Sequence, residues 1–167
     1  IVRLANAVLA RLGVRRVARP HLEELVRVTG ETATLHVPGE EDAVTVDFVP
    51  SAHYVQHVTQ LGRPSIAHAT SAGKVILAFA GRPLPSGLLR AFTPRTLTTR
   101  AALVAEVERV RHQGYAEAFE EREPGLNAVA APVWSNTGVL AAIVALQGPA
   151  VRFGKALESG DRVAVLD

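Results

Sequence analysis

The stretch IAHATSAGKVILAFAG, residues 66–81, decides the fold, because it joins an irregular polar segment to an apolar helix. Thr70 and Ser71 are N-cap candidates, since a side-chain oxygen there can accept from backbone N–H groups that lack an intrahelical partner. Apolar residues spaced three to four apart give the helix one face to bury, and Gly81 suits its left-handed end. The helix start can therefore bind an anion, although most helices that start in this way bind nothing.

Length and composition limit the class of protein. The chain has 167 residues and is 48% hydrophobic, which suits one domain with its own core. A net charge of +2 is too small to indicate a nucleic acid or an anionic membrane as partner. The sequence contains no cysteine and therefore no thiolate metal site. Its apolar runs are shorter than the ~20 residues of a membrane span, so we expect a cytoplasmic protein without a membrane partner.

Two helices are predicted near the start of the chain. Residues 1–12 place apolar side chains on one helical face, and Gly13 is expected to end this helix. Pro20 opens a second helix that Gly30 caps. The predicted buried stripe of the second helix is Leu22, Leu25, Val26 and Val17. Because the sequence begins at Ile1 rather than at Met, we expect a fragment of a longer protein, with residues 1–13 resembling a linker and residues 14–167 forming the main domain.

Strands are predicted on both sides of the 66–81 stretch. Residues 32–37 and 43–49 alternate with period two and form a hairpin, and residues 54–61 form a third strand. A strand from Tyr115 leads into a charged loop at residues 117–125. The last hairpin pairs two apolar runs, which are residues 126–134 and 139–147.

Helices are predicted between these two groups of strands. A short helix is expected over residues 86–92 and a longer one over residues 100–113, which begins after Thr98 or Thr99 and ends at Gly114. Strands joined by short turns on either side of a helical block imply an antiparallel sheet. The predicted fold class is therefore α+β, with about six strands flanked by helices.

The last hairpin carries unusually small side chains on one face. Ala128 and Ala130 share a face of the first strand, and Ala145 lies on the same face of the second strand as Gln147. Small side chains fill less of the space under whatever covers the sheet, while protein interiors are close-packed. Either a helix approaches closely there or a cavity remains for a ligand. Gln147 needs a polar partner in both cases.

One motif could carry acyl-transfer chemistry. Ser71 and Lys74 match the S-x-x-K signature of serine acyl enzymes, in which the lysine could deprotonate the serine. The accompanying K-T-G and S-D-N motifs are absent from the sequence. A phosphate-binding P-loop is excluded, because His68 replaces its first glycine and Val75 replaces its Ser/Thr.

No residue pattern indicates a metal or a cofactor. His53 and His57 would lie roughly 13 Å apart on a strand, too far to share a metal. The acidic residues of the charged loop are interpreted as a solvated turn, with paired-carboxylate catalysis as the alternative; they are Glu117, Glu120, Glu121 and Glu123. The sequence contains no dinucleotide fingerprint. We therefore predict no metal, no cofactor and no catalytic residue.

Several ordered segments resemble the effector-binding domain of the IclR family of bacterial transcription regulators. These segments are TGETATLHV, GRPSIAHATSAGKVILAF, GYAEAFEEREPGLNAVAAPVW and NTGVLAAIVALQGPAVRF. They cover most of residues 25–155 in the order and spacing of the family. The H-A-T-S-A-G-K-x-x-L-A run and the run with GY, E, PG, A-A-P-V and GP are specific in combination.

The resemblance implies a fold, a ligand and partners. The fold is a GAF-like domain with a curved antiparallel sheet and helices on both faces. A small organic acid or an aromatic metabolite binds in such domains and alters DNA binding by an N-terminal winged helix-turn-helix, a segment that this sequence does not contain. The family also implies a homodimer or homotetramer.

The resemblance also implies seven ligand-binding positions. They are Ser71, Ala72, Gly73, Ala118, Ala128, Ala145 and Gln147. The first three supply the loop donors, whereas carboxylate-binding members of the family have polar residues at the other four. Three of those four are alanine here, which predicts a larger and less polar pocket and an aromatic or otherwise bulky carboxylate as effector.

Three hypotheses follow. The first is an effector-sensing domain of a transcription regulator, which is not an enzyme. The second is a serine acyl-transfer enzyme that uses Ser71 and Lys74. The third is an oligomerisation module whose pocket is packed shut.

Overall fold

The computed structural model describes residues 2–39, 42–53, 61–62 and 64–153. The fold class is α+β, as predicted: five strands form one open sheet in the order β2-β1-β5-β4-β3, and every neighbouring pair is antiparallel. The strands are β1 (Thr32–Pro38), β2 (Ala43–Val49), β3 (Ala116–Phe119), β4 (Leu126–Trp134) and β5 (Leu140–Pro149). The helices are α1 (Val2–Thr29), α2 (Ser71–Phe79) and α3 (Arg100–Gln113). The predicted strand over residues 54–61 lies almost wholly outside the described residues.

The two predicted N-terminal helices form one continuous helix, α1. The predicted end at Gly13 is wrong, and Pro20 lies inside the helix. The prediction relied on the poor helix propensity of these two residues, about 1 kcal/mol for glycine and about 3 kcal/mol for proline. Residues on both sides of the proline share one face of α1, and burial of that face against the sheet outweighs propensity. Gly30, with φ 73°, ends the helix as predicted.

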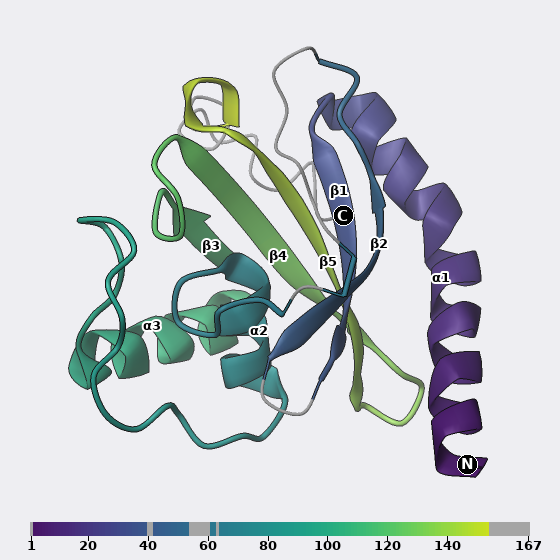
Figure 1. Ribbon diagram of the computed structural model, residues 1–167, viewed down its shortest axis with the longest axis horizontal. Helices are drawn as coiled ribbons and strands as arrows, with labels where there is room; N and C mark the ends of the chain where they lie inside the picture. The colour runs from purple at the N-terminus through teal and green to yellow at the C-terminus, as the bar shows by residue number, and fades with distance from the viewer. Residues whose placement is uncertain (1, 40–41, 54–60, 63, 154–167) are drawn as a thin grey trace.

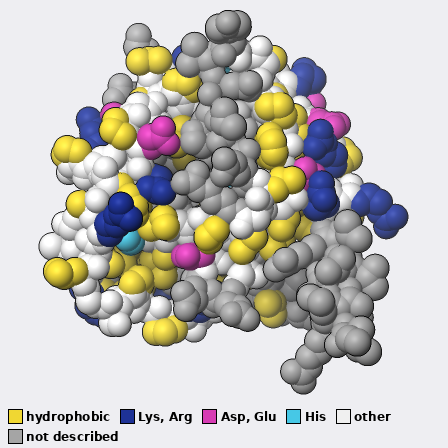
Figure 2. Space-filling model, in the orientation of Figure 1, with side chains coloured by type: hydrophobic (Ala, Val, Ile, Leu, Met, Phe, Trp, Pro, Cys, Tyr) yellow, Lys and Arg dark blue, Asp and Glu magenta, His cyan; other side chains and the backbone are white. Residues whose placement is uncertain are grey.

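The buried face of α1 differs from the predicted stripe at one position. Leu22 is fully buried, and Val14, Ala18, Leu25 and Val26 pack around it. Val17 is 67% exposed, so its predicted place in the stripe is wrong. Along the edge of the molecule where α1 lies, basic and acidic side chains are interspersed rather than gathered by sign (Figure 2).

The helices cover both faces of the sheet, and each face has its own apolar core. Helix α1 lies on one side, and α2 and α3 lie on the other (Figure 1). The larger core joins α2 and α3 to the sheet through Val75, Ile76 and Leu103. The smaller core joins α1 to β1, β4 and β5. The site described below lies on the α2 side.

The β1–β2 hairpin contains a bulge that changes which side chains face α2. The register shifts between Leu35 and His36, so that Asp47 pairs with Leu35 while Thr45 pairs with His36. A strict period of two would place Thr45 and Asp47 on the same face. Instead Asp47 forms ion pairs with α1, and Thr45 contacts His36 on the opposite side. The predicted strict alternation along this strand is therefore wrong.

Helix α3 has the predicted bounds and the predicted caps. Thr99 accepts a hydrogen bond from the N–H of Ala102, and Gly114 ends the helix with φ 86°. The predicted short helix over residues 86–92 is wrong, because this segment is irregular in the structure. Pro83 and Pro85 precede it and restrict the backbone. No helix among the described residues is long and apolar enough to span a membrane.

Candidate functional site

The start of α2 is built by its N-cap, Thr70. The Thr70 hydroxyl donates to the carbonyl oxygen of Ile66 at 2.9 Å and accepts from the N–H of Gly73 at 3.1 Å. Ser71 and Ala72 then occupy the first two helical positions, where helix geometry offers no intrahelical acceptor for the N–H group. These two N–H groups lie at the positive end of the helix dipole.

Gly73 lets the preceding loop fold tightly onto the helix. A Cβ atom at this position would lie 2.6 Å from both the Cα of Ala67 and the carbonyl oxygen of Ile66. Real Cβ atoms do not approach backbone atoms so closely, so a larger residue would push the loop away. Gly73 thereby sets the position of residues 66–70.

A cavity of about 290 Å³ lies between this loop, the start of α2 and the sheet. Its lining contains six of the seven residues predicted to bind a ligand. They are Ser71, Ala72, Ala118, Ala128, Ala145 and Gln147. Gly73 does not line the cavity, and its N–H is bonded to Thr70. The other lining residues are His36, Thr45, Pro64, Ser65, Ile66, Ala69, Thr70, Arg122, Glu123 and Leu126.

The floor of the cavity follows the strand register. Ala118 pairs with Ala128, and Ala128 pairs with Gln147, so these three residues form one row across β3, β4 and β5. In the next row Ala116, Ala130 and Ala145 lie side by side. Ala116 and Ala130 are fully buried in the core with α2 and α3. Both expected consequences of small side chains therefore occur, namely close helix packing over one part of the sheet and a cavity over another.

A buried polar group closes the other end of the floor. His36 on β1 lies 2.9 Å from Thr34 through Nε2 and 3.2 Å from Thr45 through Nδ1. Burial removes the ring from water and lowers the pKa of His36 to about 4. His36 is therefore neutral at pH 7. His36 was not among the predicted site residues. In the sequence it is one histidine in an otherwise apolar and threonine-rich strand.

Arg122 and Glu123 lie at the edge of the cavity on the β3–β4 connection. The Arg122 guanidinium carbon lies 4.2 Å from the centre of the Phe92 ring, which holds the side chain by a cation–π contact. Among the described residues that line the cavity, Arg122 alone carries a full positive charge at neutral pH. Arg122 was not among the predicted site residues, because in the sequence it lies among the acidic residues of a charged loop.

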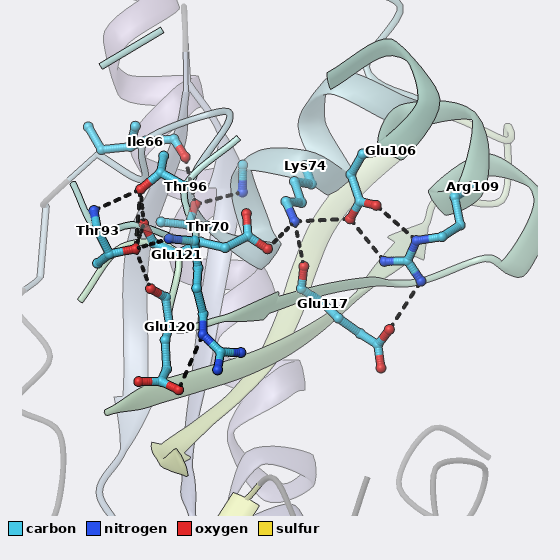
Figure 3. A network of polar contacts seen from close by, with 12 residues as sticks. Ile66, Thr70, Lys74, Thr93, Thr96, Glu106, Arg109, Glu117, Glu120 and Glu121 are labelled. Carbon is cyan, nitrogen blue, oxygen red and sulfur yellow. Dashed lines mark hydrogen bonds and ion pairs between the residues drawn. The ribbon is translucent and has the colours of Figure 1, made fainter. Parts of the chain in front are cut away.

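Lys74 is held away from Ser71 by a buried network of charges. Its ammonium group donates to Glu106 Oε1 at 2.9 Å, to the backbone oxygen of Glu117 at 2.8 Å and to Glu121 Oε1 at 2.6 Å (Figure 3). Its side chain is only 1% exposed. Arg109 completes the network by binding both Glu106 and Glu117. Because its Nζ donates to three acceptors, Lys74 is not available as a base for Ser71.

The same network corrects the interpretation of residues 117–125 as a solvated turn. Glu117 and Glu121 are buried. Burial alone would raise the pKa of Glu106, but hydrogen bonds from Arg109 and the charge of Lys74 outweigh it and lower the pKa to about 2. For Glu121 burial has the larger effect and raises the pKa, although Lys74 opposes it. Through Lys74, the carboxylates of Glu106 and Glu121 connect α2 to α3 and to the β3–β4 connection.

This geometry defines a class of protein, namely an α+β domain that encloses a ligand-sized cavity. Lys74 next to the cavity belongs to a buried network of charges. The chain belongs to the family described as bacterial transcriptional regulator IclR C-terminal, whose model matches residues 6–163. It therefore represents the effector-binding domain of an IclR-family regulator.

Comparisons with individual proteins agree with this assignment. The chain is 35% identical to the transcriptional regulator BhcR of Paracoccus denitrificans over 99% of its own length and 61% of that protein. It thus spans about three-fifths of this curated relative. IclR of Thermotoga maritima superposes with a TM-score of 0.80 at 30% identity, over 97% of this chain and 68% of that one. The inducer-binding domain of PobR from Acinetobacter was solved as a double mutant with 3-hydroxybenzoic acid. It superposes with a TM-score of 0.78 at 28% identity, over 90% of this chain and 91% of that one.

The relatives are named transcriptional regulators, which supports a regulator rather than an enzyme. The serine acyl-transfer hypothesis for Ser71 and Lys74 is therefore not supported. The linker role of residues 1–13 stays a prediction. The assembly of this chain into a homodimer or homotetramer also stays a prediction.

Proposed function

We propose that the cavity binds an organic acid with an aromatic or similarly bulky apolar body, and that binding modulates DNA recognition by an attached winged helix-turn-helix. The observation that carries the proposal is the alanine floor beneath the start of α2. Ala118, Ala128 and Ala145 offer an apolar surface that a flat ring can cover. A two- or three-carbon acid would leave most of this surface without contacts.

The polar groups around the floor suit a carboxylate. The N–H groups of Ser71 and Ala72 point from a helix start, where anions are stabilised. Arg122 supplies a positive charge at the rim, and Gln147 supplies an amide beside Ala128. We assign the ligand-binding role to Ser71, Ala72, the three floor alanines and Gln147, and we assign to Gly73 the shaping of the loop.

The size of the cavity and one relative also support an aromatic acid. A volume of about 290 Å³ lies just below the ~300–1,000 Å³ typical of small-molecule sites. PobR, a relative with the same fold, was crystallised with 3-hydroxybenzoic acid. The helix α1 offers a rigid connection through which the occupied domain could act on an N-terminal DNA-binding domain.

Calorimetric titration of this chain with glyoxylate, pyruvate, benzoate and 3-hydroxybenzoate tests the proposal. We expect the aromatic acids to bind and the small acids to bind at least tenfold more weakly. The variant Ala128→Leu fills the floor and should abolish binding while the protein stays folded. The matched control Ala105→Leu adds the same volume on an exposed position of α3 and should bind normally. Selective binding of glyoxylate or pyruvate would refute the proposal.

A further inference from the structure

His36 lies between two threonines that the β1–β2 pairing places on the cavity side of the sheet. Thr34 lies two residues away on the same face of β1, and Thr45 lies opposite His36 on β2 because of the bulge. His36 and Thr45 line the cavity. Both ring nitrogens of His36 are engaged, Nε2 by Thr34 and Nδ1 by Thr45.

The direction of these hydrogen bonds follows from the second partner of the Thr34 hydroxyl, the carbonyl oxygen of Ala145. This hydroxyl lies 2.9 Å from His36 Nε2 and 3.4 Å from the carbonyl oxygen of Ala145. Because a carbonyl oxygen only accepts, both hydrogen bonds can form together only when Thr34 donates to Ala145. We assign the arrangement in which both bonds form, with Thr34 Oγ1 accepting from His36, so that Nε2 carries the ring hydrogen. In the neutral ring Nδ1 is then an acceptor, and the Thr45 hydroxyl donates to it. Burial disfavours the doubly protonated ring, so only one of the two ring nitrogens carries a hydrogen.

With these hydrogen bonds in place, Thr45 can act toward the cavity only as a hydrogen-bond acceptor. Its hydrogen is committed to His36, while its oxygen retains lone-pair capacity to accept. A ligand group that donates, such as a hydroxyl, completes the arrangement. An ether, a carbonyl or a carboxylate at the same place would bring a lone pair against a lone pair.

We propose that Thr45 Oγ1 accepts a hydrogen bond from a hydroxyl group of the effector, so that the ligand is a hydroxylated aromatic acid rather than an unsubstituted one. The inference rests on the proposed function, since it names a second polar group on the same ligand. His36 acts as a positioning residue, because it fixes the orientation of the Thr45 hydroxyl without needing to touch the ligand. The start of α2 then binds the carboxylate of the ligand, and the β1–β2 hairpin binds its hydroxyl group.

Discrimination by one such hydrogen bond has an expected size. One neutral hydrogen bond changes affinity by up to about tenfold, and a site built for it also rejects analogues that leave its polar group unpaired. We therefore expect about a tenfold preference for hydroxybenzoates over benzoate and over the corresponding methoxybenzoates.

The experiment is a calorimetric cycle between ligand and protein. Wild type, Thr45→Val and the control Thr98→Val, which changes an exposed threonine before α3, are each titrated with benzoate, 3- and 4-hydroxybenzoate and their methyl ethers. The hydroxyl preference should vanish in Thr45→Val, with benzoate affinity unchanged, and should persist in Thr98→Val. Persistence in Thr45→Val, or equal binding of all the aromatic acids by wild type, would overturn this inference alone. Failure of every aromatic acid to bind would overturn the proposed function as well.

A second measurement keeps the inference testable if Thr45→Val does not fold. The nitrogen chemical shifts of the His36 ring in wild-type protein report which nitrogen carries the hydrogen. Protonated Nε2 with bare Nδ1 is the expected result. A hydrogen on Nδ1 would turn the Thr45 hydroxyl toward the cavity as a donor and would overturn the inference.

Discussion

Burial of His36 should make the stability of this domain depend on pH in mildly acidic solution. The pKa of His36 is about 4 in the folded protein, compared with the ordinary value of 6.5. Between these two values the unfolded chain binds a proton that the folded chain does not bind. The free energy of unfolding must therefore fall as the pH is lowered through this window. Above about pH 6.5 the ring is neutral in both states, and its contribution is constant.

The size of the effect follows from the two pKa values. One pKa unit corresponds to about 1.4 kcal/mol, and integration over the window gives a loss of about 2 kcal/mol at pH 5 and about 3 kcal/mol at pH 4. The ring is almost wholly buried, so solvent does not screen the effect. Small domains have only ~5–15 kcal/mol of stability, so a loss of this size is readily measured.

Urea unfolding followed by circular dichroism provides the assay, with His36→Gln as the variant. The carboxylates that titrate in both proteins cancel in the difference between them. We expect wild type to lose about 2 kcal/mol more than the variant between pH 7.5 and pH 5. The exposed His112 on α3 provides the control His112→Gln, which should follow the wild-type profile.

Parallel profiles for wild type and His36→Gln would refute this reasoning. So would titration of the folded His36 ring near pH 6.5 in an NMR experiment. In either case the ring would be better solvated than its position between Thr34 and Thr45 indicates. A solvated ring could also carry hydrogens on both nitrogens, and the Thr45 hydroxyl would then not donate to Nδ1.

Three further predictions concern stability, each measured as the change in the free energy of unfolding in urea. Lys74→Met should destabilise the domain by about 3–5 kcal/mol, because it leaves the buried Glu121 carboxylate without its cation, while Glu106 keeps Arg109; a change below 1 kcal/mol would show that the network is dispensable. Gly73→Ala should cost about 1–3 kcal/mol, because its Cβ would press on the backbone of Ala67, and unchanged stability would argue against this close approach. Thr99→Ala should cost about 1 kcal/mol through loss of the α3 cap, whereas Thr99→Ser should remain near wild type.

The elements that were predicted correctly are those with local signals at both ends. Helix α3 has a threonine cap and a glycine in the left-handed conformation, and β4 is bounded by turns. The continuity of α1 through Gly13 and Pro20 could not be predicted in this way, because it depends on the sheet that covers its buried face. The short helix expected after α2 does not form, because Pro83 and Pro85 restrict the backbone before it, and Leu89 reaches the core from an irregular segment.

The small side chains of the candidate site could be predicted from the sequence, but the contacts between residues far apart in the chain could not. Small side chains at Ala128 and Ala145 appear directly in the sequence as missing volume. The inward direction of Thr45 depends on a bulge at His36, which the sequence pattern does not reveal. The burial of Glu121 likewise depends on Lys74, which lies 47 residues earlier in the chain.

The charge network and the cavity are linked through the β3–β4 connection. Thr93 and Thr96 bind the backbone oxygens of Glu120 and Glu121, and Lys74 binds the side chain of Glu121 (Figure 3). Arg122 is the next residue and lines the cavity. Because Lys74 also lies one turn after Ser71, one buried cation fixes both the helix start and the rim arginine relative to each other. The two groups that suit a carboxylate are therefore held by a common support, which gives Lys74 a structural role beside the cavity.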